Sequence, residues 1–213
     1  MKSRVFFVTG IDTNVGKSYA TGYIARQYAM EGKRVITQKF IQTGNTGISE
    51  DIETHRKIMG ISLLPVDLDG TTCPIVLSYP ASPHLAAAID NRNINIDSIT
   101  AATDLLSKKY DIVLIEGAGG LMTPVTERIT TLDFIQKQRL HVIVVSSPKL
   151  GSINHTLLTL ELCKANNIRV DTLVYNKSTI DNPLICHDTE NYLKNYIRNR
   201  LPSCKWLDLP FLD

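Results

Sequence analysis

Short apolar runs alternate with segments of helical periodicity along this chain. The runs are β-branched or aliphatic almost throughout, as in strands that are covered on both faces of a sheet. They predict strands at Arg4–Thr9, Arg34–Phe40, Asp111–Ile115, His141–Ser147 and Arg169–Tyr175. The intervening periodicity predicts helices at Gly16–Met30, Asp51–Met59, Ser82–Ile89, Asp97–Lys108, Thr131–Gln138, Ser152–Ala165 and Pro183–Arg200. Strands joined through helices of this length predict an α/β fold with a mostly parallel sheet flanked by helices on both faces.

Local signals mark the ends of some of these helices. Gly32 follows the first helix as a stop signal, Asp97 suits an N-cap, and Pro183 has the fixed φ that suits a first helical turn. The segments 43–49 and 64–74 are long and irregular, and no element is predicted in them. In a parallel sheet, ligands gather at the carboxyl ends of the strands, so the residues that follow each strand are the candidates for a site.

Composition and charge narrow the function without naming it. The 213 residues are 43% hydrophobic and 21% charged, with a formal net charge of +2. One α/β domain over 1–213 accounts for this length, and the near-neutral charge balance argues against a nucleic-acid partner. No apolar run approaches the roughly 20 residues of a membrane span, and the first residues lack the pattern of a signal peptide, so we expect a cytoplasmic protein. The four cysteines have no metal or redox spacing and are expected to be reduced and mostly buried.

A glycine-rich segment, GIDTNVGKS, runs from Gly10 to Ser18 between the first strand and the first helix. Backbone N–H groups of such a loop bind phosphate oxygens, its lysine reaches the β- and γ-phosphates, and its hydroxyl binds Mg²⁺. Lys17 and Ser18 have these two roles. Five residues separate Gly10 from Gly16 where the usual motif has four, so its place before a long helix carries the assignment. The sequence predicts a P-loop NTPase-type fold, and Asp12 stands where one subgroup of partitioning and transport ATPases has a signature lysine, which argues against that subgroup.

Three charged residues outside this glycine-rich segment are further candidates. Glu116 ends a buried strand before the GAGG turn and suits Mg²⁺, although a Glu there can also cap the next segment. Asp51 is equally a metal ligand or a first-turn helix charge. Lys39 ends the second strand, where it either neutralises developing phosphoryl charge or is a solvated surface lysine. The GAGG turn does not complete a dinucleotide motif, and His55, like the other four histidines, lacks metal-ligand spacing, so structural or surface roles are expected for all five.

Five segments in order resemble one enzyme family. GIDTNVGKS, KFIQTG, ASPHLAAA, IEGAGGLMTPV and KLGSINHTLLT together resemble the dethiobiotin synthetases, and the similarity runs from Val5 to Asn176. The resemblance implies a homodimeric P-loop enzyme, a carbon–nitrogen ligase of biotin biosynthesis. It implies 7,8-diaminononanoate, CO₂ and ATP as substrates and Mg²⁺ as cofactor, with a phosphorylated carbamate that closes to the cyclic urea.

The resemblance also assigns roles to residues of this chain. The implied catalytic residues are Lys17 and Lys39, and the implied metal ligands are Ser18, Asp51 and Glu116. The implied nucleotide-binding residues are Asn14, Val15, Gly16, Lys17, Ser18, Tyr19, Asp51, Glu116, Gly117, Ala118, Gly119, Asn176 and Lys177. The implied substrate-binding residues are Thr43, Gly151, Ser152 and Asn154, and the last three belong to a helix start that receives the substrate carboxylate across the dimer interface. The segment Pro80–Pro83 resembles a substrate-side loop.

The sequence departs from the family pattern at three places. Asn14 stands where many members have Glu, and Lys177 stands where some have Asp beside the base-binding asparagine. Many members also continue past the last strand with a base-binding segment and a terminal helix, whereas this sequence closes with WLDLPFLD, so the comparison predicts a weak or shared base preference. A related P-loop amide-forming enzyme and a non-synthetic nucleotide switch are the alternative interpretations. The first would need a glutaminase domain, for which the chain has no room.

Overall fold

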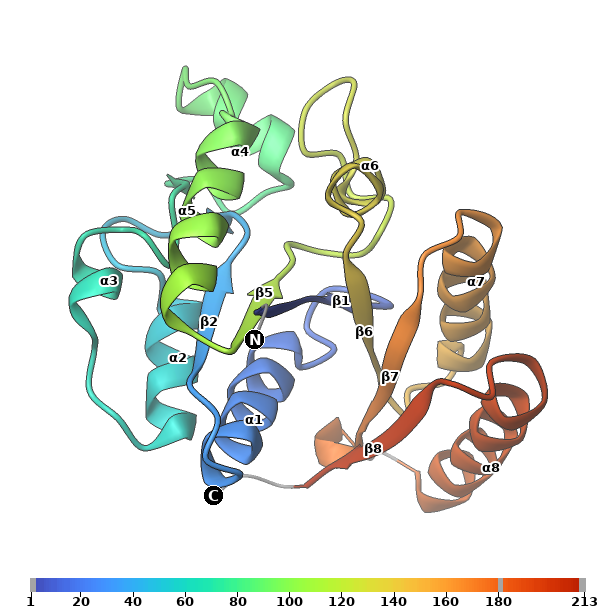
Figure 1. Cartoon of the computed structure of the whole chain (residues 1–213). Coiled ribbons are helices and arrows are strands. Elements are labelled where there is room, and N and C mark those ends of the chain that lie inside the picture. The colour runs from blue at the N-terminus through green and yellow to red at the C-terminus, as the bar shows by residue number, and fades with distance from the viewer. Residues whose placement is uncertain (1–2, 180–181, 211–213) are drawn as a thin grey trace.

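The structure is a computed structural model that describes residues 3–179 and 182–210; residues 1, 2, 180, 181 and 211–213 of the predicted single domain lie outside it. Six parallel strands form one sheet in the order β2-β5-β1-β6-β7-β8, which Figure 1 shows running from one side of the molecule to the other. The strands are β1 Arg4–Gly10, β2 Val35–Lys39, β5 Ile112–Glu116, β6 His141–Ser146, β7 Val170–Asn176 and β8 Lys205–Leu209. Two short strands, β3 Gln42–Thr43 and β4 Val76–Leu77, pair separately.

Helices cover both faces of this sheet (Figure 1). They are α1 Lys17–Met30, α2 Glu50–Met59, α3 Pro65–Leu68, α4 Pro83–Ile89, α5 Ile96–Lys109, α6 Thr131–Gln138, α7 Ser152–Ala165 and α8 Pro183–Arg200. A 3₁₀ turn, η1, spans Lys177–Thr179. α1 packs on one face, where Ala20 and Ile24 bury against Val8 and Leu114. The helices α4 to α8 pack on the other face, around Phe7 and Phe134. The predicted two-sided α/β fold is confirmed.

Strand positions explain why polar loops meet at one edge of the sheet. β1 lies between β5 and β6, with Val8 opposite Glu116 and Gly10 opposite Val145. β2 pairs with β5 so that Lys39 stands opposite Glu116. Because the strands are parallel, the carboxyl ends of β1, β2 and β5 lie side by side and bring the phosphate loop, Lys39 and Glu116 together.

The structure corrects several details of the predicted elements. Asn95, not Asp97, is the N-cap of α5; its side chain accepts a hydrogen bond from the Asp97 backbone, and Asp97 lies in the first turn, where its charge favours the helix dipole. β8 was not predicted, because its side chains are mostly part-exposed and its pattern is not a continuous apolar run. The segments predicted to lack elements contain the short helix α3 and adjoin β3. All four cysteines are free, and Cys204 is the one that is only partly buried.

Candidate active site

The phosphate loop is held in an unusual backbone conformation. Gly16 has φ 94°, in the left-handed region, and a Cβ placed on it would lie 2.2 Å from Nδ2 of Asn176. That same nitrogen donates to the backbone oxygen of Val15 at 2.9 Å, while Oδ1 of Asn176 accepts from the backbone and hydroxyl of Ser178. Only glycine fits at position 16, and the loop is fastened to the end of β7.

Lys17 opens α1 and is buried, with its ammonium group turned back over the loop. Its Nζ donates to the backbone oxygen of Asp12 at 2.9 Å. Burial lowers the pKa of Lys17 from 10.5 to about 8, against the opposing effect of Glu116. A buried cation without a directly bonded carboxylate is under-compensated, which favours an anion such as phosphate beside it.

Carboxylates and a second lysine form a compact cluster beside the loop. Oγ of Ser18 lies 2.7 Å from Oδ1 of Asp51 and 2.9 Å from Oε1 of Glu116, and Nζ of Lys39 donates to the same Oε1 at 2.9 Å. Lys39 also pairs with Asp51 and donates to the backbone oxygen of Gly117. Lys39 is therefore buried in an ion cluster, and the alternative of a solvated surface lysine is wrong.

The two charged partners shift each other's ionisation. Burial by itself lowers the pKa of Lys39, but the carboxylates of Glu116 and Asp51 outweigh it and raise that pKa above its ordinary value. Burial by itself raises the pKa of Glu116, and Lys39 and His55 outweigh it, so the pKa of Glu116 falls well below its usual range. Both groups stay charged at neutral pH. The cluster therefore places one positive and two negative side chains, Lys39, Asp51 and Glu116, next to the phosphate loop.

These side chains line one cavity of about 930 Å³. Its lining includes most of the predicted site: Asn14, Gly16, Lys17, Ser18, Tyr19, Lys39, Thr43, Asp51, Glu116, Ala118 and Gly119. The segment Pro80–Pro83 lines it too, opposite the loop that follows β5. This cavity is large enough for a nucleoside triphosphate with a small metabolite beside it.

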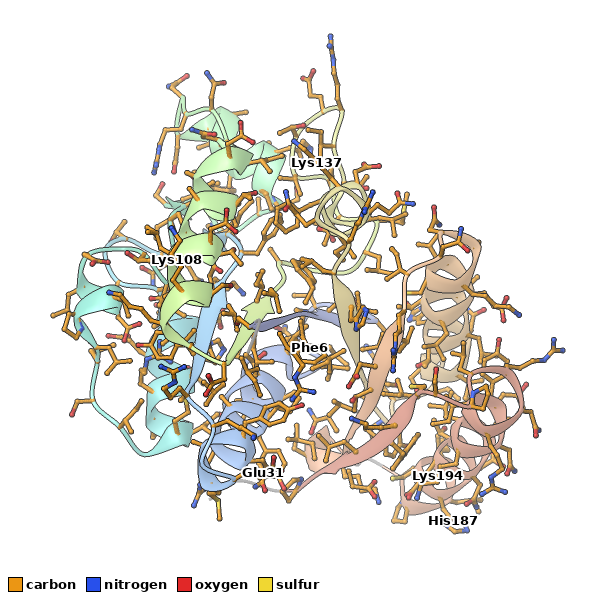
Figure 2. All side chains as sticks on the ribbon, in the orientation of Figure 1. Phe6, Glu31, Lys108, Lys137, His187 and Lys194 are labelled. Carbon is orange, nitrogen blue, oxygen red and sulfur yellow. The ribbon has the colours of Figure 1, made fainter. Side chains whose placement is uncertain are left out.

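Other predicted residues lie elsewhere. Lys177 forms ion pairs with Glu190 at 2.9 Å and Asp208 at 3.1 Å. Lys194 of α8 (Figure 2) also pairs with Glu190 and lies over the Trp206 ring. This arrangement ties Lys177 to α8 and β8. The carboxamide of Asn176 is bonded to protein partners on both sides, as described above.

The helix start predicted to bind substrate also lies outside the main cavity of its own chain. Ser152 lines a separate cavity of about 250 Å³ with Asp12 and Asn14, and Gly151 lines another with Leu150. Oγ of Ser152 is buried and has no hydrogen-bond partner among the described residues. Asn154 is exposed on the first turn of α7.

Sequence reasoning gave His55 a structural or surface role, and the structure places it in the cluster. Its Nε2 lies 2.6 Å from Oε2 of Glu116, and the ring is fully buried. Asp51 and His55 are four residues apart on α2, so they lie on one helical face. That spacing is the signal that could have identified His55.

Comparison with known proteins decides the family. Residues 4–201 match the family model described as an AAA domain. The chain is 48% identical over 201 residues to the ATP-dependent dethiobiotin synthetase BioD 2 of Pasteurella multocida, covering 94% of each chain. It is 54% identical over 173 residues to the BioD 2 protein of Haemophilus influenzae, covering 81% of this chain and 91% of that one. The chain belongs to the dethiobiotin synthetase family.

Family membership agrees with the wider likeness of the fold. The ParA family ATPase from Chlorobium tepidum superposes with a TM-score of 0.55 at 17% sequence identity, covering 95% of this chain and 84% of that one. At that identity the likeness concerns the fold alone, and it is the P-loop α/β fold predicted from the sequence. Along residues 3–179 and 182–210, no helix combines the length and the hydropathy needed to cross a membrane.

Proposed function

We propose that this protein is an ATP-dependent dethiobiotin synthetase, a ligase that forms carbon–nitrogen bonds. The supporting observation is that Lys17, Lys39, Ser18, Asp51 and Glu116 surround one cavity in a chain that is 48% identical to a curated synthetase over 94% of its length. The alternatives, an amide-forming relative and a nucleotide switch, have no comparable support.

The proposed reaction joins 7,8-diaminononanoate and CO₂. One amine of the diamine becomes a carbamate, a carbamate oxygen takes the γ-phosphoryl group of ATP, and the second amine attacks the mixed anhydride. Ring closure releases phosphate and gives dethiobiotin, with ADP as the other product. Lys17 and Lys39 are the cations that stabilise the negative charge of the carbamate and of the transferring phosphoryl group.

Ser18, Asp51 and Glu116 are the residues that would hold Mg²⁺. The donor set fits this ion, because a hydroxyl and two carboxylates are the hard oxygen ligands that Mg²⁺ prefers, with water and phosphate completing its coordination. Among the described residues, no group of three or more His, Cys, Asp or Glu side chains is placed to hold a metal. Bound Mg²⁺ would neutralise charge on the β- and γ-phosphates.

We further propose a homodimer in which the start of α7 binds the substrate carboxylate for the partner's cavity. Exposed N–H groups at a helix start favour an anion, and Asn154 is an exposed polar side chain on the first turn of α7. Exposed apolar side chains gather near α7: Leu158 and Met122 border one cavity and Leu150 and Leu184 another. A second copy covering them would bury this apolar surface. We expect the cytoplasm as its location and no nucleic-acid or membrane partner.

The test is direct synthesis of the product. Purified protein is incubated with 7,8-diaminononanoate, bicarbonate and MgATP, and dethiobiotin is sought by mass spectrometry, with reactions lacking each component as controls. We expect a product that requires all of them and carries label from ¹³C-bicarbonate in its urea carbon. Failure to form dethiobiotin with ATP, GTP or CTP would contradict the proposal.

A further inference from the structure

Glu116 uses its two carboxylate oxygens for different partners. Oε1 faces the site, where it accepts from Ser18 and Lys39, both at 2.9 Å. Oε2 faces away from them and meets Nε2 of His55 at 2.6 Å. An ionised carboxylate only accepts hydrogen bonds, so this contact requires a hydrogen on Nε2, which donates a hydrogen bond to Oε2.

His55 is built into the fold so that its ring has little freedom. It lies one turn after Asp51 on α2, a helix whose start is fixed by the Ser49 side chain, which accepts from the Ile52 backbone. The neighbouring Arg56 is fixed by Asp67 and Thr37, which fastens α2 to α3 and to β2. Unlike a hydroxyl hydrogen, the imidazole N–H cannot rotate independently, so the orientation of the ring fixes the direction of its hydrogen bond.

The other ring nitrogen contributes no competing bond. Nδ1 of His55 is buried without a hydrogen-bond partner among residues 3–179 and 182–210. Within the described part of the chain, no second hydrogen bond from Nδ1 therefore turns the imidazole ring away from Glu116. Among the described residues, the His55 side chain makes one hydrogen bond, to Glu116.

A carboxylate held on one oxygen cannot rotate freely about its last torsion, which is otherwise broad. Without His55, both oxygens of Glu116 would be available to Lys39 and Ser18. Hydrogen bonds to the far oxygen of a metal-binding carboxylate orient the near one, and removing such a partner typically costs about 10–100-fold in metal affinity.

We propose that His55 is a positioning residue of the magnesium–nucleotide site, which fixes Oε2 of Glu116 so that Oε1 alone is presented to Ser18, Lys39 and the bound cation. This inference rests on the proposed Mg²⁺ role of Asp51 and Glu116. Residue 55 therefore sets the affinity for the divalent cation without touching nucleotide or substrate.

The test measures Mn²⁺ binding in the presence of the non-hydrolysable analogue AMPPNP, using the electron paramagnetic resonance signal of free Mn²⁺. His55→Leu removes the donor, and His55→Gln restores an N–H at a similar reach. We expect Mn²⁺ affinity to fall about 10–100-fold in His55→Leu and to recover to within about threefold of wild type in His55→Gln. Metal-free binding of AMPPNP in EDTA should be unchanged in both. His187→Gln, at an exposed position on α8 (Figure 2) and not among the residues that line the cavity, is the matched control.

A third variant covers the case in which His55→Leu does not fold. His55→Asn carries its amide nearer the backbone, out of reach of Oε2, so it should lose Mn²⁺ affinity as His55→Leu does, while His55→Gln keeps it. Folded His55→Leu or His55→Asn protein with Mn²⁺ affinity within twofold of wild type would overturn the inference. Asp51→Asn distinguishes failure of the proposed metal site from failure of the proposed role of His55. If Asp51→Asn leaves Mn²⁺ binding intact, the proposed metal site is wrong. If it abolishes Mn²⁺ binding that the His55 variants retain, only the role of His55 is wrong.

Discussion

The two lysines of the site are both buried, yet their environments differ. Nζ of Lys39 is bonded to two carboxylates, and its pKa is raised, whereas Nζ of Lys17 is bonded to a backbone oxygen, and its pKa is lowered to about 8. Carboxylates thus neutralise the charge of Lys39, whereas the charge of Lys17 has no directly bonded carboxylate and is available to a bound phosphate. Substitution of each should have a different outcome.

Lys39→Gln should slow ring closure while leaving nucleotide binding largely intact. Removing a cation that stabilises developing charge typically lowers kcat by about a hundred to a thousandfold, whereas the phosphate loop and Lys17 remain. Steady-state formation of dethiobiotin and calorimetric titration with AMPPNP measure the two effects. Lys137→Gln, at an exposed position on α6, is the matched control. Loss of nucleotide binding in Lys39→Gln with an unchanged kcat would reverse the assignment.

Lys17→Met should stabilise the nucleotide-free protein while abolishing nucleotide binding. Burial holds the folded-state pKa of Lys17 near 8, below its unfolded value of 10.5, so the folded protein binds this proton less tightly. The charged Lys17 therefore lowers the free energy of unfolding. This destabilisation is fully present below pH 8 and is lost as the pH rises to 10.5; at pH 7 it amounts to about 3 kcal/mol at most. Urea unfolding should show a higher free energy of unfolding for Lys17→Met than for wild type at pH 7, and this difference should be smaller at pH 10. A variant less stable than wild type at pH 7 would contradict this.

Residue-level prediction from the sequence succeeded where a motif fixed both identity and place. The loop from Gly10 to Ser18 and the strand ends at Lys39 and Glu116 converge as expected, because parallel strand ends share an edge. The sequence did not indicate that His55 lies beside Glu116, because its four-residue spacing from Asp51 is informative only once α2 is known to face the site. The carboxamide of Asn176 turns to the loop and η1, an orientation that no local pattern encodes.

At the scale of elements, α2 is anchored through one buried ion pair. Nε and Nη2 of Arg56 donate to Asp67 at 2.8 and 2.7 Å, and Nη1 donates to the Thr37 hydroxyl at 2.7 Å. Burial by itself raises the pKa of Asp67, but hydrogen bonds from Arg56, Leu64 and Thr72 outweigh it and lower that pKa. This pair joins α2, β2 and the segment after Leu64, which sequence patterns left without structure.

Arg56→Met should lower the free energy of unfolding by about 3–5 kcal/mol, because it leaves the buried carboxylate of Asp67 without its charge partner. Chemical denaturation measures the change. Arg34→Met is the matched control: the Arg34–Asp111 pair is exposed at 68% and 37% of side-chain area, so solvent screens it and its loss should lower the free energy of unfolding far less. Equal losses in the two variants would mean that the buried pair contributes no more than a surface pair.

Element boundaries were predictable where propensity and burial agree, as for α6, whose N-cap Thr130 completes a capping box with Asp133. β8 was missed because a strand at the sheet edge is covered less completely, so its side chains do not form an apolar run. Tertiary pairing with β7, through Leu173 and Trp206 among others, makes it a strand.

For the whole molecule, the proposed dimer makes the apolar surface near α7 a functional feature. Leu150 and Leu158 are 81% and 62% exposed in the single chain. The double variant Leu150→Glu/Leu158→Glu should sediment as a species of 23.7 kDa where wild type sediments at twice that mass. It should also raise the KM for the diamine. Leu105→Glu, equally apolar and 54% exposed on α5, should leave the mass unchanged. A wild-type monomer at micromolar concentration would refute the proposed assembly.

The hydrogen bond between Asn176 and Val15 joins residues 161 positions apart. A growing polypeptide therefore carries every residue of the large cavity long before it acquires the amide that braces the phosphate loop. β1 likewise lacks one neighbour until β6 has been made. The brace on the phosphate loop can therefore form only after β7 has been made.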